Sequence, residues 1–242
     1  MNRGLKVIVI PNSFYGNLVP AIFRHRLHRF GAEVEMAGGE VEIVHIPNSG
    51  RLRELLYSGN RVGLHFEGHP GRKTDYTLVK ARTPAGWCYI DSRLPNRILV
   101  KHWSELPPLK GFTGASPEVT FGNSRFDLAL RGEGLPGKVA FLEAKCVTLI
   151  AGKTGLFPDA PTARGRKHLE ELIAVAGEGG QAFIFFFLQH PGGGELKANR
   201  KTDPGFADLM KKAKEEGVKF YAYRVVLNGE ELELELVPVW FS

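Results

Sequence analysis

A β-strand is predicted at residues 138–148, where the sequence reads KVAFLEAKCVT. Because strand side chains alternate between two faces, Glu143 and Lys145 share one face. A carboxylate and an ammonium group placed in this way can form a simple ion pair, or they can belong to a catalytic site. An acidic residue on a neighbouring strand would favour the catalytic site over the simple ion pair.

A second acidic residue lies on the preceding predicted strand, residues 125–130, which reads RFDLAL and places Asp127 between apolar residues. A hairpin between the two strands would bring Asp127 beside Glu143, and close carboxylates repel each other unless a cation lies between them. Hard oxygen ligands with open positions suit Mg²⁺ or Mn²⁺. The pattern therefore predicts a metal site with Asp127, Glu143 and Lys145 as catalytic residues. An ion pair between Glu143 and Lys145, with Asp127 at a solvent-exposed sheet edge, would have the same spacing.

The C-terminal half alternates strand and helix patterns. Apolar residues recur with helical spacing over 163–176, and residues 182–188 read AFIFFFL, which is typical of a central strand buried on both faces. A second helix is predicted from Asp203 as N-cap to a stop at Gly217. Further strands are predicted at 118–121, 125–130, 138–148, 219–226 and 231–237. This order predicts an α/β fold of the mixed α+β kind, with helices on the faces of a mixed sheet.

The N-terminal half has a different pattern. From residue 19 to residue 90, short strand candidates alternate with turn signals, and one short helix is predicted at Arg51–Leu56. A small curled antiparallel sheet of this kind could be an OB-like barrel, a fold that often binds single-stranded nucleic acid. We therefore expect an N-terminal domain over 1–100, with 1–15 as an extension of uncertain role, and a second domain over 101–242.

The positive charge is concentrated in the first domain. Residues 1–100 carry 14 Lys and Arg against 8 Asp and Glu, whereas the 18 of each kind in residues 101–242 cancel. Such a surface can bind phosphate backbones, although an ordinary solvated basic surface has the same composition. The two cysteines, without a CxxC pattern, indicate a reducing cytoplasm, and the apolar stretches near the start are too short for secretion or membrane insertion.

Two basic runs are candidates for contact with nucleic acid. In the run from Arg24 to Phe30, alternation would put basic side chains and an aromatic ring on one face, as in a single-strand groove or on a charged edge strand. The second run, Arg164 to His168, begins a predicted helix with Thr162 as N-cap. Cations are unfavourable at a helix N-terminus unless an anion binds there, although a solvated basic face would also tolerate this position.

The chain resembles the sugar fermentation stimulation protein A family. The resemblance is carried by GNSRFDL at 122–128, LEAKCVTL at 142–149 and FPDAPTARGRKH at 157–168, and also by PNSGR at 47–51 and LPN at 94–96. It covers nearly the whole chain after about residue 15. It implies an OB-like N-terminal domain, a C-terminal restriction-endonuclease-like domain of the PD-(D/E)xK type, and DNA binding of low sequence specificity. By position, Glu118, Asp127 and Glu143 match the acidic residues of that fold, and Lys145 matches its lysine.

Two functions are compatible with these features. The first is a Mg²⁺- or Mn²⁺-dependent nuclease, with metal at Glu118, Asp127 and Glu143. The second is a DNA-binding transcriptional regulator of sugar metabolism that does not cut. Single-stranded DNA, double-stranded DNA and RNA all remain possible partners. The residues expected to contact nucleic acid are Arg24, Arg26, Arg29, Arg51, Arg125, Arg164, Arg166, Lys167 and His168.

Overall fold

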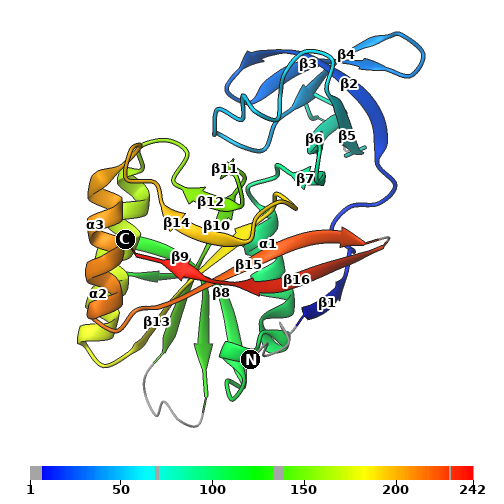
Figure 1. Cartoon of the computed structure of the whole chain (residues 1–242). Coiled ribbons are helices and arrows are strands. Elements are labelled where there is room, and N and C mark those ends of the chain that lie inside the picture. The colour runs from blue at the N-terminus through cyan, green and yellow to red at the C-terminus, as the bar shows by residue number, and fades with distance from the viewer. Residues whose placement is uncertain (1–6, 69–70, 133–138, 229, 242) are drawn as a thin grey trace.

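The N-terminal part of the chain forms a small closed barrel (Figure 1). The computed structural model describes residues 7–68, 71–132, 139–228 and 230–241. Six strands form one sheet in the order β4-β3-β2-β5-β6-β7, and a pairing between β4 and β6 closes five of them into a barrel. These strands are β2 (Val19–His28), β3 (Gly31–Met36), β4 (Val41–His45), β5 (Arg61–Phe66), β6 (Tyr76–Thr83) and β7 (Gly86–Tyr89). The expectation of an OB-like barrel is confirmed.

The second part is built around a seven-stranded mixed sheet in the order β1-β16-β15-β13-β10-β9-β8. The two central pairings, β10 with β13 and β13 with β15, are parallel, and the others are antiparallel. The strands are β1 (Val7–Pro11), β8 (Gly114–Phe121), β9 (Ser124–Arg131), β10 (Ala140–Val147), β13 (Gln181–Leu188), β15 (Lys219–Asn228) and β16 (Glu231–Val237). Every residue of β13 after Gln181 is buried, which confirms the predicted central strand.

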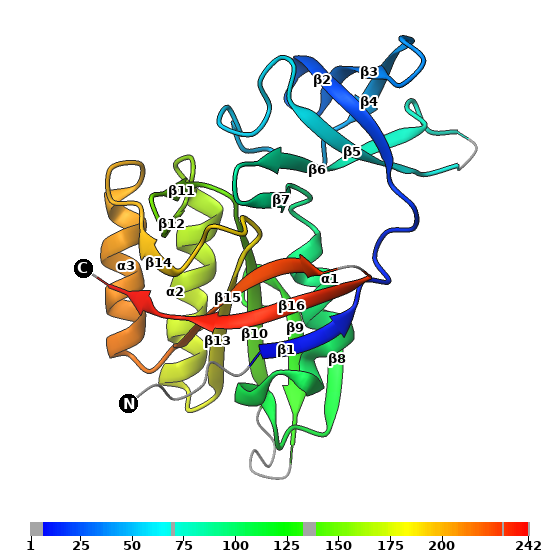
Figure 2. The ribbon, with the colours of Figure 1, turned by 45° about the vertical axis from the view of Figure 1, so that its right-hand side comes forward.

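Helices cover both faces of this sheet, as Figure 2 shows. Helix α1 (Leu94–His102) packs through Leu94, Ile98 and Leu99 on one face, whereas α2 (Ala163–Gly177) and α3 (Pro204–Glu215) cover the other. The apolar stripe predicted for residues 163–176 packs against this face, with Leu169 and Leu172 buried and Ile173 and Ala176 half-buried. The remaining elements are the short helices η1 (Trp103–Glu105) and η2 (Pro107–Leu109) and a small sheet of β11 (Ile150–Ala151), β12 (Thr154–Phe157), β14 (Glu195–Ala198) and β17 (Val239–Trp240).

The division of the chain differs from the expected one at residue 100. Strand β1, from the extension whose role was uncertain, pairs with β16 and so completes the C-terminal sheet. Helix α1, which the sequence patterns did not predict, begins at Leu94 and packs on that same sheet. The segment Arg51–Leu56 forms turns instead of the predicted short helix. Local patterns could not show which sheet would bury β1 and α1.

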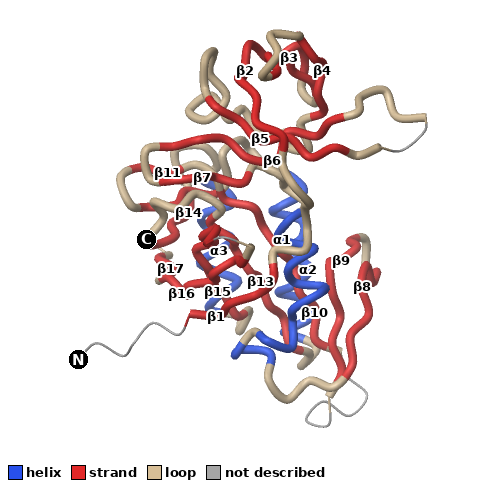
Figure 3. Tube along the Cα trace, turned by 90° about the vertical axis from the view of Figure 1, so that its right-hand side faces the viewer, coloured by secondary structure: helices blue, strands red, loops and turns tan. Residues whose placement is uncertain are grey.

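The barrel lies at one end of the large sheet, as Figure 3 also shows. Its position is fixed by hydrogen bonds at the junction. The Gln189 side chain, which follows β13, donates to the carbonyls of Tyr89 (2.8 Å) and Asp91 (3.2 Å), and the Gln189 amide donates to Val147 at the end of β10. The carboxyl ends of β10 and β13 therefore face the barrel.

Candidate functional site

The strands β9 and β10 separate where their acidic residues lie. Their backbone pairing ends at Leu128 and Leu142, one residue from Asp127 and Glu143. Instead of a further ladder bond, Asp127 Oδ2 accepts a hydrogen bond from the Ala144 amide at 2.7 Å. Asp127 Oδ1 accepts one from the Asn96 side chain on α1 at 2.6 Å. Asp127 is thus held between two strands and a helix.

Glu143 is buried, with 4% of its surface exposed. Its Oε1 atom accepts hydrogen bonds from Lys145 Nζ and from His168 Nδ1, both at 2.6 Å. Its Oε2 atom is buried and has no hydrogen-bond partner among the residues that the structure describes. The carboxylate therefore has one oxygen fixed by two donors and one oxygen left for a ligand.

The charges of the two carboxylates are coupled. Burial, followed by the negative charge of Glu143, raises the pKa of Asp127, although the Ala144 amide and Asn96 partly oppose this shift. Burial alone would raise the pKa of Glu143, but the Lys145 charge and the His168 hydrogen bond lower it overall. The two pKa values therefore shift in opposite directions, and a cation beside both carboxylates would relieve their repulsion.

A divalent cation fits part of this site. Asp127 and Glu143 provide oxygen ligands, and Glu143 Oε2 has no protein partner in the described chain. Mg²⁺ commonly uses one or two carboxylates and completes its shell with water and phosphate oxygens. No group of three or more His, Cys, Asp or Glu side chains is arranged to hold a metal within residues 7–68, 71–132, 139–228 and 230–241.

The structure does not bring Glu118 into this group. Glu118 lies on β8 at the position facing Asp127, where the regular pairing of β8 with β9 is interrupted. Its φ angle of 54° is in the left-handed region, which disfavours side chains other than glycine. The Glu118 carboxylate is largely exposed and pairs with Arg125 at 3.0 Å. In this conformation Arg125 neutralises Glu118.

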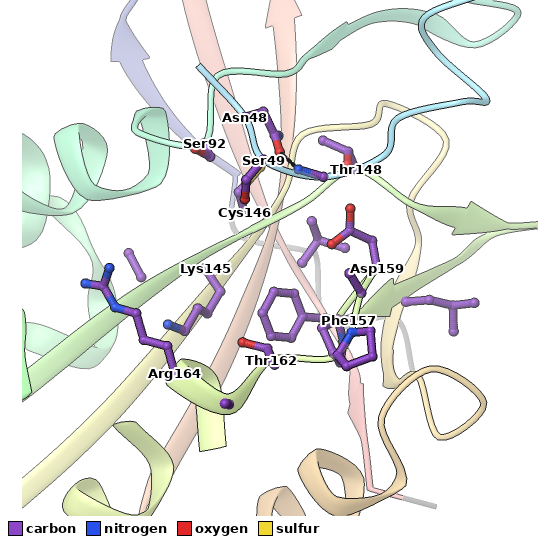
Figure 4. Close-up of a pocket in the computed structure, with 18 of the residues that line it drawn as sticks. Asn48, Ser49, Ser92, Lys145, Cys146, Thr148, Phe157, Asp159, Thr162 and Arg164 are labelled. Atoms are coloured by element: carbon purple, nitrogen blue, oxygen red, sulfur yellow. Dashed lines mark hydrogen bonds between the residues drawn. The ribbon is translucent and has the colours of Figure 1, made fainter. Parts of the chain in front are cut away.

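A cleft of about 540 Å³ opens beside Glu143 and Lys145, between the barrel and the sheet domain. Figure 4 shows Lys145 and Arg164 at one side of this cleft, with Asn48 and Ser49 of the barrel domain above it. Helix α2 begins at the cleft, where Thr162 Oγ1 accepts a hydrogen bond from the Gly165 amide as the predicted N-cap. The site thus combines an acidic pair, several cations and a helix N-terminus, which favour a phosphate-bearing ligand.

The basic residues predicted to contact nucleic acid have three kinds of environment. Arg29 and Arg164 line the cleft. Arg24, Arg51, Arg125 and Lys167 are exposed, with Arg24 paired to Glu35 and Lys167 donating to the Asn123 carbonyl. The other three residues were expected to point outward but have partners inside the protein. Arg26 donates to backbone carbonyls, Arg166 pairs with Asp203, and His168 contacts Glu143.

The physical reason differs for each of these three residues. Two register shifts in β2 break the expected alternation, so the Arg26 side chain turns toward the 48–51 loop. Arg166 neutralises Asp203, whose carboxylate is almost fully buried. His168 lies four residues after Arg164 on the buried side of α2, where it reaches Glu143.

The sequence patterns missed two residues of this site. Asn96 holds Asp127, although it had been noted only as part of the LPN segment. Asp159 lines the cleft, although it had been noted only within FPDAPTARGRKH. The available signal for Asp159 was its place in the highly specific segment 157–168, and the signal for Asn96 was only its place in the LPN segment that resembles the family.

No helix in the described residues is long and apolar enough to cross a membrane.

Comparisons with known proteins agree with this architecture. Residues 25–90 match the family model described as the SfsA N-terminal OB domain, and residues 93–231 match the sugar fermentation stimulation protein RE domain. Curated sugar fermentation stimulation protein homologs are similar, one from Carboxydothermus hydrogenoformans (42% identity, covering 93% of this chain and 94% of that protein) and one from Clostridium perfringens strain SM101 (41%, covering 90% and 94%). The solved structure of Pyrococcus furiosus SfsA in complex with Ca²⁺ superposes with a TM-score of 0.85 at 29% identity, covering 96% of this chain and 99% of that one. The suspected resemblance and the fold, an OB barrel followed by a restriction-endonuclease-like mixed-sheet domain, are confirmed, and the chain belongs to the sugar fermentation stimulation protein family.

Proposed function

We propose that this protein binds DNA with low sequence specificity and hydrolyses its phosphodiester bonds with Mg²⁺ or Mn²⁺. The observation that carries this proposal is the environment of Glu143. One oxygen of this buried carboxylate is fixed by Lys145 and His168, the other has no partner among the described residues, and Glu143 lines a cationic cleft. Most buried polar atoms are hydrogen-bonded, so an unpaired carboxylate oxygen beside a cleft is a candidate ligand for a cation.

Each side chain has a distinct role in this proposal. Asp127 and Glu143 would hold the cation, with Asn96 and His168 fixing their orientations. When bound, a divalent cation supplies positive charge to phosphate oxygens and makes a bound water more acidic. The Lys145 ammonium lies 2.6 Å from Glu143 and lines the cleft, so it can stabilise the charge that develops on an attacked phosphate.

The related Pyrococcus furiosus structure supports the choice of cation class, because that protein was solved with Ca²⁺. Calcium and magnesium are both hard cations that prefer oxygen ligands. Glu118 is a third candidate ligand in this proposal, but it would first have to leave Arg125.

Both cysteines are free thiols, which supports a cytoplasmic location.

Nucleic-acid binding is proposed to depend mainly on phosphate contacts. Arg29, Lys145 and Arg164 line the same cleft from both domains, and the chain carries a net charge of +6. Binding of this kind weakens steeply as salt concentration rises and discriminates little between sequences. Measuring affinity for unrelated sequences over a salt series would test this part.

The decisive experiment compares cleavage, metal binding and folding on the same protein preparations. Labelled DNA and RNA are incubated with Mg²⁺, Mn²⁺ or EDTA and wild type, Lys145→Ala, Asp127→Asn or Glu143→Gln. We expect metal-dependent cleavage by wild type, loss of cleavage of at least a hundredfold in Lys145→Ala with DNA affinity reduced only severalfold, and weakened metal binding in the two carboxylate variants.

The matched control is Lys211→Ala, an exposed lysine on α3 outside the cleft, which should behave as wild type. Wild-type protein that binds DNA but cuts neither DNA nor RNA with any of these metals would contradict the nuclease proposal. That result would favour a DNA-binding regulator that does not cut.

A further inference from the structure

The roof of the cleft comes from the barrel domain. Asn48, Ser49 and Gly50 of the loop that follows β4 lie over β10 and the 156–164 segment. Gly50 approaches the Asp159 carboxylate so closely that an added Cβ atom would collide with it. The two domains therefore meet at the far side of the cleft, and the 48–50 loop covers part of the space between them.

Several hydrogen bonds hold this roof in place. The Arg26 guanidinium donates five hydrogen bonds of 2.6–3.3 Å, which end on the carbonyls of His28, Arg29, Asn48, Gly50 and Arg51. The Asn48 side chain donates to the Ile90 carbonyl at 2.7 Å, and the Ser92 hydroxyl donates to the Pro47 carbonyl at 2.7 Å. Opening the cleft by moving this loop would break these bonds.

The size of the cleft limits what can enter it. Its volume, about 540 Å³, is within the range of about 300–1,000 Å³ that is usual for pockets that hold one small ligand. A DNA duplex carries both strands together, and its major groove alone is about 12 Å wide. A cleft of this size, covered on one side by the 48–50 loop, therefore suits one nucleotide unit of a separated strand better than a whole duplex.

The two sides of the cleft differ in charge, as Figure 4 shows. Lys145 and Arg164 lie on one side, whereas Thr148 and Asp159 lie on the other. Cations favour the phosphate of a nucleotide. Hydroxyl and carboxylate groups can exchange hydrogen bonds with a sugar or with the donors on a base edge.

We propose that this cleft is a binding compartment for one nucleotide of a single-stranded nucleic acid, with the phosphate at Lys145 and Arg164 and the sugar and base at Ser49, Thr148 and Asp159. This inference rests on the proposed nuclease function, because it assigns the substrate class of that site. If the inference holds, the protein acts on single strands or on unpaired ends. The 47–50 loop, which is held by hydrogen bonds, then keeps a duplex away from Glu143.

The test fills the compartment without touching the metal-site residues. Ser49 is exposed and lines the cleft, so Ser49→Trp should fold normally and occupy the space. Ser58→Trp is the matched control, because Ser58 is an exposed serine of the same domain that does not line the cleft. Thermal unfolding of both variants checks that each remains folded.

Two measurements are made on wild type and both variants. Cleavage is compared among a single strand, a blunt duplex and a duplex with a single-stranded tail, as DNA and as RNA. Binding of a 5′-phosphorylated dinucleotide is measured by calorimetry with Ca²⁺, which does not require turnover. We expect wild type to cut single strands and tails at least tenfold faster than blunt duplex. In Ser49→Trp, dinucleotide binding and strand cleavage should fall at least tenfold, whereas Ser58→Trp should retain both.

The outcomes separate this inference from the proposed function. Equal cleavage of duplex and single strand, with no effect of Ser49→Trp, would overturn the compartment and leave the nuclease function intact. If nothing is cut but the dinucleotide binds and Ser49→Trp abolishes that binding, the nuclease function fails and the compartment stands. If folded wild type does not bind the dinucleotide, the compartment is refuted whatever the cleavage result.

Discussion

The two basic runs, residues 24–30 at the end of β2 and residues 164–168 on α2, look alike in sequence, but their charges have different partners. Each run has one arginine that lines the cleft, Arg29 or Arg164, and one with internal partners, Arg26 or Arg166. In the first run the internal arginine binds neutral backbone carbonyls, whereas in the second it binds a buried carboxylate. The second run also places His168 on Glu143.

This difference shows that a count of charges does not give the charge available to a ligand. Arg26 stabilises the loop that roofs the cleft, and Arg166 stabilises the loop and helix that form its floor. Only part of each run remains free for phosphate. The following predictions test the comparison through these individual residues.

Arg166→Ala should have the largest effect on stability. Burial alone would raise the pKa of Asp203, but the amides of Thr162 and Phe206 and the Arg166 charge lower it overall, so its carboxylate is charged at neutral pH. Without Arg166 that buried charge loses its cationic partner, which should cost about 3 kcal/mol. The loss should be full at neutral pH and should shrink as the pH falls from 3.8, the ordinary pKa of aspartate in the unfolded chain, through the lowered pKa of Asp203 in the folded protein.

Urea unfolding at several pH values measures this effect. Arg200→Ala is the control, because it removes an exposed ion pair with Asp208 and should cost less than about 1 kcal/mol. A similar loss in both variants, or a loss in Arg166→Ala that is independent of pH, would show that the Asp203 pair does not determine the effect.

Arg26→Ala should have an intermediate effect, about 1–2 kcal/mol, because its carbonyl partners are neutral and water can reach several of them. The effect should be local. Limited proteolysis should cut faster within residues 47–51, and Arg26→Lys should not restore protection, because one ammonium cannot reach five carbonyls. Arg24→Ala, which removes an exposed pair with Glu35, is the control. Unchanged proteolysis of the loop in Arg26→Ala would contradict the assigned role.

Arg29→Ala and Arg164→Ala should have the smallest effect on folding and act on affinity instead. Each removes a cation that lines the cleft, so each should weaken DNA binding severalfold and reduce the slope of log affinity against log salt by about 1. Lys211→Ala on α3 should leave the slope unchanged. If the slope of log affinity against log salt concentration is the same for all variants and wild type, the DNA binds outside the cleft.

The secondary structure of the C-terminal half was largely predictable, because its patterns are local. The run of apolar residues at 182–188 gave a fully buried strand, and Asp203 caps α3 by accepting a hydrogen bond from the Phe206 amide at 2.9 Å. The spacing of Glu143 and Lys145 also predicted their contact at 2.6 Å. These features depend on neighbours in sequence, whose geometry follows from strand alternation and helix capping.

The sequence by itself determined the buried strand β13, helices α2 and α3 with their caps, and the ion pair on β10, since each follows from residues a few positions apart. Only the tertiary structure decided that β1 joins the distant strand β16, that Asn96 holds Asp127, and that His168 binds Glu143. The tertiary structure also decided which arginines can contact a ligand. Arg166 pairs with the buried Asp203, and Arg26 donates to carbonyls of the 48–51 loop, so both point inward. These contacts join residues separated by 22 to more than 200 positions, and packing of the two domains selects them where no local pattern can.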